Sequence, residues 1–141
     1  MKISQILAEK GEETWSIGPD ATVFEALELM AQKGIGALLV VDEDRLIGIL
    51  SERDYARKVI LLGRGSRKTS VRDIMSPDPC CIRPEQTIDD AMALMTEKRI
   101  RHLPVVEEGE LAGIVTIGDV VKAKIATQEF VIQQLENYIR S

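Results

Sequence analysis

The chain has 141 residues, of which 45% are hydrophobic and 29% are charged, values that are ordinary for a globular protein of one domain or two very small ones. Its formal net charge of −5 argues against general nucleic-acid binding, because that requires a basic surface. No stretch of about 18 uncharged apolar residues occurs, so we expect no membrane partner. The N-terminus lacks the long apolar segment of a signal peptide, and we expect a cytoplasmic protein.

An internal repeat organises the sequence. A shift of 65 residues aligns residues 17–60 with residues 82–125 without a gap, and 17 of these 44 aligned positions are identical. Unrelated segments would share only a few identities. Self-similarity of this kind predicts two copies of one supersecondary unit.

Each copy opens with a short extended segment that ends at a proline, and a helix is expected to follow at residues 20–34 and 85–99. This prediction depends on apolar residues that recur on one helical face. In the first copy these are Val23, Ala26, Leu27 and Met30. The candidate N-cap residues are Asp20 or Thr22 in the first copy and Glu85 or Thr87 in the second.

Two strands and a second helix complete each copy, because two segments rich in Val, Leu and Ile are separated by an acidic turn. The strands are expected at residues 37–42, 46–51, 102–107 and 111–116, and the closing helices at residues 53–61 and 118–126. A β-α-β-β-α unit of this size, about 60 residues, is too short to bury a self-sufficient core. We therefore expect an α/β (α+β) fold in which two such units pack as a pseudo-twofold pair with clefts between them.

The boundaries of these units are expected to follow the order of the sequence. Residues 1–70 would form the first repeat with a basic linker, residues 71–126 the second repeat, and residues 127–141 a C-terminal helix. An apolar stripe on this last helix consists of Phe130, Val131, Leu135, Tyr138 and Ile139. Two interpretations stay open: the stripe packs on its own domain, or it is a contact in a dimer.

One phrase, G-h-h-[ST]-x-x-D, occurs at residues 48–54 and again at residues 113–119. An ionised aspartate accepts hydrogen bonds only, so one carboxylate can bind both hydroxyls of a ribose. A hydroxyl side chain at the strand–helix junction can cap the helix or reach a phosphate, which the helix dipole also favours. The phrase thus predicts that Ser51 with Asp54, and Thr116 with Asp119, bind a nucleotide.

The same spacing also resembles a capping box, which would explain both copies without any ligand. That box prefers Glu or Gln, whose longer side chains reach back to the N-cap amide. Both copies have the shorter aspartate, and we take this difference to favour ligand binding.

The two β-α-β-β-α units, the segment "RIRHLPVV" at residues 99–106 and the paired phrase resemble a CBS domain pair, also called a Bateman module. The segments "SERDYARKV" and "VRDIM" are similar to stand-alone members of that family. The resemblance covers residues 1–126 and implies binding of AMP, ADP, ATP, NAD(H) or S-adenosylmethionine. It also implies a homodimer that regulates a partner protein.

The resemblance implies that Arg101 and His102 face the phosphates of the ligand, and an arginine fork suits phosphate. The first copy departs from this pattern, because Gly36 and Ala37 stand at the equivalent positions. We therefore expect unequal occupancy of the two clefts. The alternative is that Arg101 and His102 lie in a solvated turn.

A basic segment between residues 53 and 72 could neutralise phosphates, or it could be a solvated loop without a ligand role. Its members are Arg53, Arg57, Lys58, Arg64, Arg67, Lys68 and Arg72. Ile17 and Ile82 are candidate walls for the adenine, or simply core residues. The predicted ligand residues are Ile17, Ser51, Arg53, Asp54, Arg57, Ile82, Arg101, His102, Thr116, Gly118 and Asp119.

We expect no enzyme activity and no catalytic residues, because Ser51 has no assignable base and no P-loop or Rossmann glycine pattern occurs. We also expect no metal site, because Cys80 and Cys81 are adjacent and the chain has one histidine. The sequence thus predicts an adenine-nucleotide sensor, with a ligand-free dimeric interaction module as the alternative.

Overall fold

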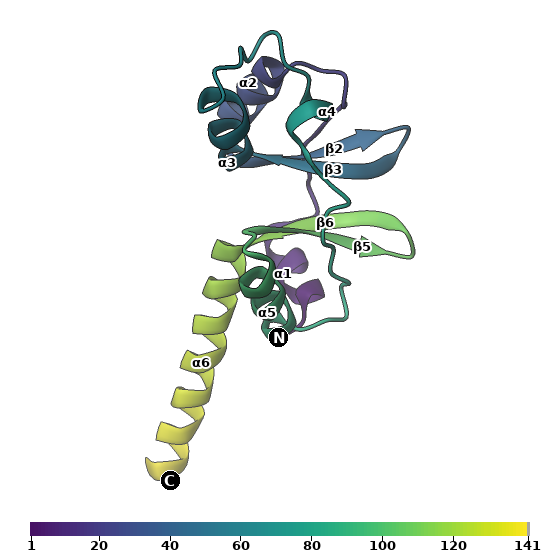
Figure 1. Cartoon of the computed structure of the whole chain (residues 1–141). Helices are drawn as coiled ribbons and strands as arrows, with labels where there is room; N and C mark the ends of the chain where they lie inside the picture. Colours follow the sequence, from purple (N-terminus) through teal and green to yellow (C-terminus); the bar gives the residue numbers. More distant parts are fainter. Residues whose placement is uncertain (141) are drawn as a thin grey trace. The chain divides into compact units, whose positions relative to one another are not determined.

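The computed structural model describes residues 1–140 and divides the chain into two compact units (Figure 1). The first-repeat unit is Thr14–Pro79. The second-repeat unit combines Met1–Glu13 with the part of the chain that begins at Cys80. Within residues 1–140, no helix is both long and apolar enough to cross a bilayer.

The first-repeat unit is built on a four-stranded sheet in the order β1-β2-β3-β4. Strand β1 is parallel to β2, and the other pairs are antiparallel. Its elements are β1 (Ser16–Ile17), α2 (Val23–Lys33), β2 (Ala37–Asp42), β3 (Arg45–Ser51), α3 (Glu52–Tyr55), the π-helix η1 (Ala56–Ile60), α4 (Val71–Ile74) and β4 (Ser76–Pro77). Apolar residues of α2, β2, β3, η1 and α4 form one buried cluster.

The second-repeat unit repeats this arrangement around an antiparallel strand pair, β5 (His102–Glu107) and β6 (Glu110–Thr116). Ile82 makes a parallel bridge with Val105, which corresponds to the β1–β2 pairing of the other unit. The helices are α1 (Ile3–Lys10), α5 (Ile88–Lys98) and α6 (Ile117–Arg140). The predicted β-α-β-β-α order is confirmed in the first half, and in the second half the first strand is reduced to the bridge at Ile82.

The helices α2 and α5 begin at the threonines among the proposed N-cap residues. Thr22 Oγ1 accepts a hydrogen bond from Glu25 N at 3.1 Å, and Thr87 Oγ1 accepts one from Asp90 N at 3.1 Å. Each hydroxyl satisfies an amide that has no partner within the first helical turn. The two threonines thus determine where these helices start.

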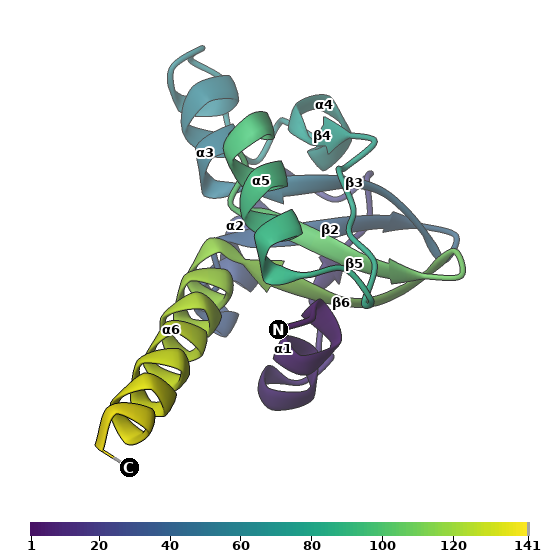
Figure 2. The same cartoon turned by 90° about the horizontal axis from the view of Figure 1, so that it is seen from below.

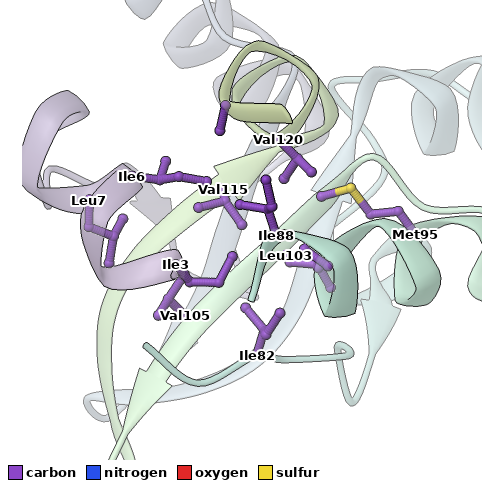
Figure 3. Close-up of a cluster of buried hydrophobic side chains, with 12 residues drawn as sticks. Ile3, Ile6, Leu7, Ile82, Ile88, Met95, Leu103, Val105, Val115 and Val120 are labelled. Carbon is purple, nitrogen blue, oxygen red and sulfur yellow. The ribbon is translucent and has the colours of Figure 1, made fainter. Parts of the chain in front are cut away.

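The two units exchange their flanking segments, so the observed division differs from the expected boundaries. Helix α1 packs on the second repeat, where Ile3, Ile6 and Leu7 join the buried core (Figure 3). Its first amides donate to carbonyls of the same unit, from Ile3 N to Gln86 O and from Ser4 N to Pro84 O, both at 2.9 Å. An amphipathic helix packs where its apolar face is covered, whichever repeat is adjacent in sequence.

The segment after the linker makes the reciprocal contact with the first repeat. Val71 and Ile74 of α4 are fully buried in the core of that unit. Val71 N donates to Ala21 O and Arg72 N to Pro19 O, each at 2.9 Å. Residues 71–79 therefore belong to the first-repeat unit rather than to the second.

Helix α6 is continuous from Ile117 to Arg140, whereas separate helices were expected at residues 118–126 and 127–141. No glycine or proline occurs between Asp119 and Arg140, so nothing in the sequence interrupts the helix. Ser141, the last residue of the expected C-terminal helix, lies outside the described residues.

The glycine of the repeated phrase is explained by close packing in both units. A Cβ on Gly48 would lie 2.6 Å from Met75 Sδ and 3.0 Å from the carbonyl oxygen of Ser76. A Cβ on Gly113 would lie 2.8 Å from Leu7 Cδ2. At Gly48 the close approach comes from residues 75–76, just after α4, and includes a backbone carbonyl, whereas at Gly113 it comes from the end of the Leu7 side chain in α1.

We expect Gly48→Ala to lower the free energy of unfolding by about 1–3 kcal/mol, because the added methyl group overpacks against a backbone carbonyl that cannot rotate away. Urea unfolding measures this change. Gly18→Ala is the control, because a Cβ at Gly18 meets nothing within 4 Å. Equal stability of the two variants would contradict the close approach.

Candidate functional site

The first copy of the repeated phrase lies at the junction of β3 and α3. Ser51 is the N-cap residue, and Asp54 N donates to Ser51 Oγ at 3.2 Å. In return, Asp54 Oδ2 accepts the Ser51 amide at 2.9 Å and the Ser51 hydroxyl at 3.1 Å. Asp54 Oδ1 lies 3.3 Å from Lys58 Nζ and 3.4 Å from Ser76 Oγ. Both carboxylate oxygens of Asp54 thus have partners.

The second copy has the same geometry at the junction of β6 and α6. Asp119 N donates to Thr116 Oγ1 at 3.1 Å, and Thr116 N donates to Asp119 Oδ2 at 2.9 Å. Lys10 Nζ of helix α1 also lies 2.7 Å from Asp119 Oδ2 and donates to Ile114 O at 3.0 Å. The hydrogen bonds from Thr116 N and Lys10 Nζ both go to Oδ2 of Asp119.

The pKa of Asp119 is lowered from its ordinary value. Burial is the largest single influence and raises the pKa, but it is outweighed by contacts that favour the anion. These are the hydrogen bond and charge of Lys10 and the hydrogen bonds from Thr116. The Asp119 carboxylate is therefore ionised at neutral pH and stays so into the acid range.

The structure corrects the argument that aspartate is too short for a capping box. The aspartate at the third position accepts the N-cap amide in both copies of the phrase, as described above. Helix α5 has the same arrangement, in which Thr87 N donates to Asp90 Oδ2 at 3.0 Å. Capping therefore accounts for the spacing of the phrase, and the residues around each junction must distinguish a ligand site from a cap.

The fold brings the predicted basic residues of the second copy to the same junction. His102 is paired with Thr116 in the β5–β6 register, and Ile117 N donates to the carbonyl of Arg101 at 2.8 Å. Arg101 is exposed and His102 is half-buried. Arg101, His102, Thr116, Gly118 and Asp119 thus lie at one end of the hairpin. Figure 2 shows this end of β5 and β6, where α6 begins.

In the first copy, the equivalent positions carry no charge. Ala37 is paired with Ser51, and Glu52 N donates to the carbonyl of Gly36 at 3.0 Å. The backbone geometry is the same, but no cation comes from the start of β2. The charges near this junction come instead from Arg53 in α3 and Arg57 in η1, which are both exposed, and from Lys58.

The two isoleucines proposed as adenine walls differ in burial. Ile17 is half-buried at the edge of its core. Ile82 is only 1% exposed, and its main chain is paired with β5 through hydrogen bonds to Pro104 O and from Val106 N. In this structure Ile82 is a core residue of the second-repeat unit.

The basic segment is dispersed over separate contacts. Arg67 stacks on the ring of Phe24, with its guanidinium carbon 4.2 Å from the ring centre, and Arg72 lies 3.5 Å from Asp20. An open depression of about 490 Å³ in the first-repeat unit is lined by Arg64, Gly65, Lys68, Thr69 and Asp73. None of the predicted ligand residues lines it.

Sequence reasoning missed Lys10, Lys58 and Ser76 as neighbours of the two carboxylates. Lys58 follows Asp54 by one helical turn, so an i,i+4 ion pair could have been expected. Lys10 and Ser76 reach their carboxylates only because α1 and β4 pack on the units described above. No local pattern indicates those contacts.

Comparison with known proteins decides the family. The model of the CBS domain matches residues 12–60 and 71–126. The chain belongs to the CBS domain family. This CBS protein is 40% identical to "CBS domain-containing protein CBSX3, mitochondrial" of Arabidopsis thaliana, over 98% of the chain and 71% of that protein. It spans 38% of a longer relative from Thermofilum pendens, to which it is 42% identical.

Solved structures show the same CBS pair fold. A protein with CBS domains from Burkholderia ambifaria is 49% identical and superposes with a TM-score of 0.88, covering 91% of this chain and 96% of that one. CBSX2 in complex with AMP is 30% identical, with a TM-score of 0.71, and the match covers 90% of this chain and 98% of that one.

We expect Lys10→Met to raise the pKa of Asp119. The variant loses the hydrogen bond and charge of Lys10, so only the Thr116 hydrogen bonds remain to offset the effect of burial. Carbon-detected NMR titration of the Asp119 carboxyl measures the change. In this CBS protein the lowered pKa stabilises the fold above the unfolded value of about 3.9, and this contribution is lost as the pH falls through the folded value. Lys10→Met should therefore reduce the difference in stability between pH 6 and pH 3.

Lys122→Met is the matched control, because Lys122 is exposed on the same helix as Asp119. It removes one positive charge without touching the carboxylate. A shift of the Asp119 pKa as large as that of Lys10→Met would show that general charge, rather than the 2.7 Å contact, lowers the pKa.

Proposed function

We propose that this CBS protein binds an adenine nucleotide and that the bound nucleotide regulates a partner protein. The observation that carries the proposal is the Asp119 carboxylate at the end of β6. It is ionised, and the bonds from Thr116 N and Lys10 Nζ both go to its Oδ2. The AMP complex of CBSX2 supports the choice of ligand class.

The ribose of the nucleotide would donate its hydroxyls to Asp119. One hydroxyl would bind Oδ1, the oxygen that neither Thr116 N nor Lys10 Nζ contacts. A second bond, to Oδ2, requires that this oxygen be shared with Lys10 or that Lys10 move away. Hydrogen bonds to a charged acceptor are each worth about 1.5–3 kcal/mol, so a fixed carboxylate selects strongly for a sugar with two adjacent hydroxyls.

The phosphates would lie toward Arg101 and His102, which stand at the same end of the hairpin as Thr116. The main-chain amides and the dipole at the start of α6 also favour an anion there. The first-repeat junction has Gly36 and Ala37 instead, and both oxygens of Asp54 already have partners. We therefore propose that the junction of the second repeat binds the nucleotide more tightly.

The ligand class of this proposal comprises AMP, ADP, ATP, NAD(H) and S-adenosylmethionine, which share the adenosine ribose. A cytoplasmic location is part of the same proposal, although one relative is named as mitochondrial. The alternative function is a ligand-free interaction module, in which the boxes at Ser51 and Thr116 are helix caps only. The cap at Thr87 favours that alternative, because it has the same geometry.

We expect Asp119→Asn to weaken binding of AMP, ATP, NADH or S-adenosylmethionine at least about tenfold, because the amide replaces one charged acceptor oxygen with a donor. Isothermal titration calorimetry of the full chain measures this, with circular dichroism as the test of folding. Asp54→Asn should weaken binding less than Asp119→Asn does.

Asp90→Asn is the matched control, because it alters an equal capping box on α5. If Asp90→Asn and Asp119→Asn reduce affinity equally, the effect is one of helix capping and not of ribose binding. If none of the four ligands gives heat with the wild-type chain, the interaction module is the correct function.

A further inference from the structure

The second half of helix α6 has no cover from its own unit. Residues 128–140 are all exposed, and the buried positions of the helix end at Ala123. Figures 1 and 2 both show this end of α6 extending past α1 and α5, the other helices of its unit. An isolated helix of about 12–15 residues is marginal in water, so a projecting segment of this length needs a packing partner.

An apolar seam runs along the exposed side of this helix with spacings that alternate between four and three residues. Its members are Val121, Ile125, Gln128, Ile132, Leu135 and Ile139. The five apolar members are between 42% and 79% exposed. This period of 3.5 residues is that of a coiled coil, with Ile125, Ile132 and Ile139 at the a positions.

The seam does not lie on the side that packs against the second-repeat core. Val120 and Ala123 make that contact and are buried, whereas Val121 and Ile125 are exposed. The interpretation that the C-terminal stripe packs on its own domain therefore fails for the seam. Of the stripe noted in the sequence, Leu135 and Ile139 belong to the seam, and Phe130 lies on the outer side of the helix.

One pair of residues that flanks the seam is complementary in charge to the same pair of a second copy. Lys124 precedes an a position, and Glu129 follows a d position. In a parallel pair, the residue just before an a position lies beside the residue five positions later on the other helix. Lys124 of each chain would therefore lie beside Glu129 of the other chain, which gives two such contacts per dimer. Within one chain Lys124 pairs with the exposed Asp89, a surface contact that it can exchange. Isoleucine at a with Leu135 at d favours two parallel strands, and the polar Gln128 favours one register.

We propose that the seam of α6 joins two copies of this chain as a parallel, two-stranded coiled coil. The occupant is a second copy because equal a and d positions meet in a parallel pair, and Lys124 of each chain would lie beside Glu129 of the other. The contact does not depend on nucleotide binding, so it stands or falls separately from the proposed function.

The first test places charge in the seam. The full chain should sediment as a dimer, and Ile132→Glu with Leu135→Glu should raise the dimer dissociation constant at least about tenfold, because two carboxylates per chain enter an apolar contact. Both residues are exposed within one chain, so circular dichroism should show an intact fold. Phe130→Glu is the control: it makes the same kind of change on the outer side and should leave the dimer unchanged.

The second test determines direction by crosslinking. In a background with Cys80→Ser and Cys81→Ser, Leu135→Cys should form a disulfide between copies on mild oxidation, because equal d positions meet in a parallel pair. Gln133→Cys, on the outer side, should not. A monomeric wild-type chain, a dimer or hexamer insensitive to the two glutamates, or the absence of a crosslink in the Leu135→Cys variant would each overturn the proposal.

Discussion

The reciprocal hydrogen bonds between a strand-end hydroxyl residue and the aspartate three positions later are the constraint on which both halves depend. At each junction the hydroxyl accepts the aspartate amide, and the carboxylate accepts the amide of the hydroxyl residue. These two bonds end the strand, begin the helix and fix one carboxylate oxygen. The same residues therefore determine the backbone path and the direction in which a charge is presented.

The elements of each unit could be predicted from the sequence, because period 2 and period 3.6 patterns are local. The threonine caps and the β-hairpins followed from such patterns. The exchange of α1 and α4 could not be predicted. Ile3 and Val71 belong to short apolar segments, and nothing in their sequences indicates which of the two cores they join. Each segment was assigned to the repeat next to it in the sequence, which is the wrong unit. The contact of Lys10 with Asp119 was missed for the same reason.

The repeated phrase is a weaker sign of function than its sequence suggested. Asp90 forms the same box on α5, a helix that does not begin directly after a β-hairpin. What distinguishes Asp119 is its place: the hairpin register brings His102 opposite Thr116, and the carbonyl of Arg101 binds the first turn of α6. Position in the fold, rather than the motif, makes Thr116 and Asp119 the better candidate for an anionic ligand.

The two carboxylates also differ in what their lysines connect. Lys58 lies one turn from Asp54, so its ion pair adds only local stability. Lys10 comes from a helix 109 residues away and is held by both Asp119 and the Ile114 carbonyl. A ligand that displaces Lys10 from Oδ2 of Asp119, rather than sharing that oxygen with it, would weaken the attachment of α1. By linkage, tighter attachment of α1 must then weaken ligand binding to the same degree. This coupling gives the proposed sensor a physical route from Asp119 to the N-terminal helix.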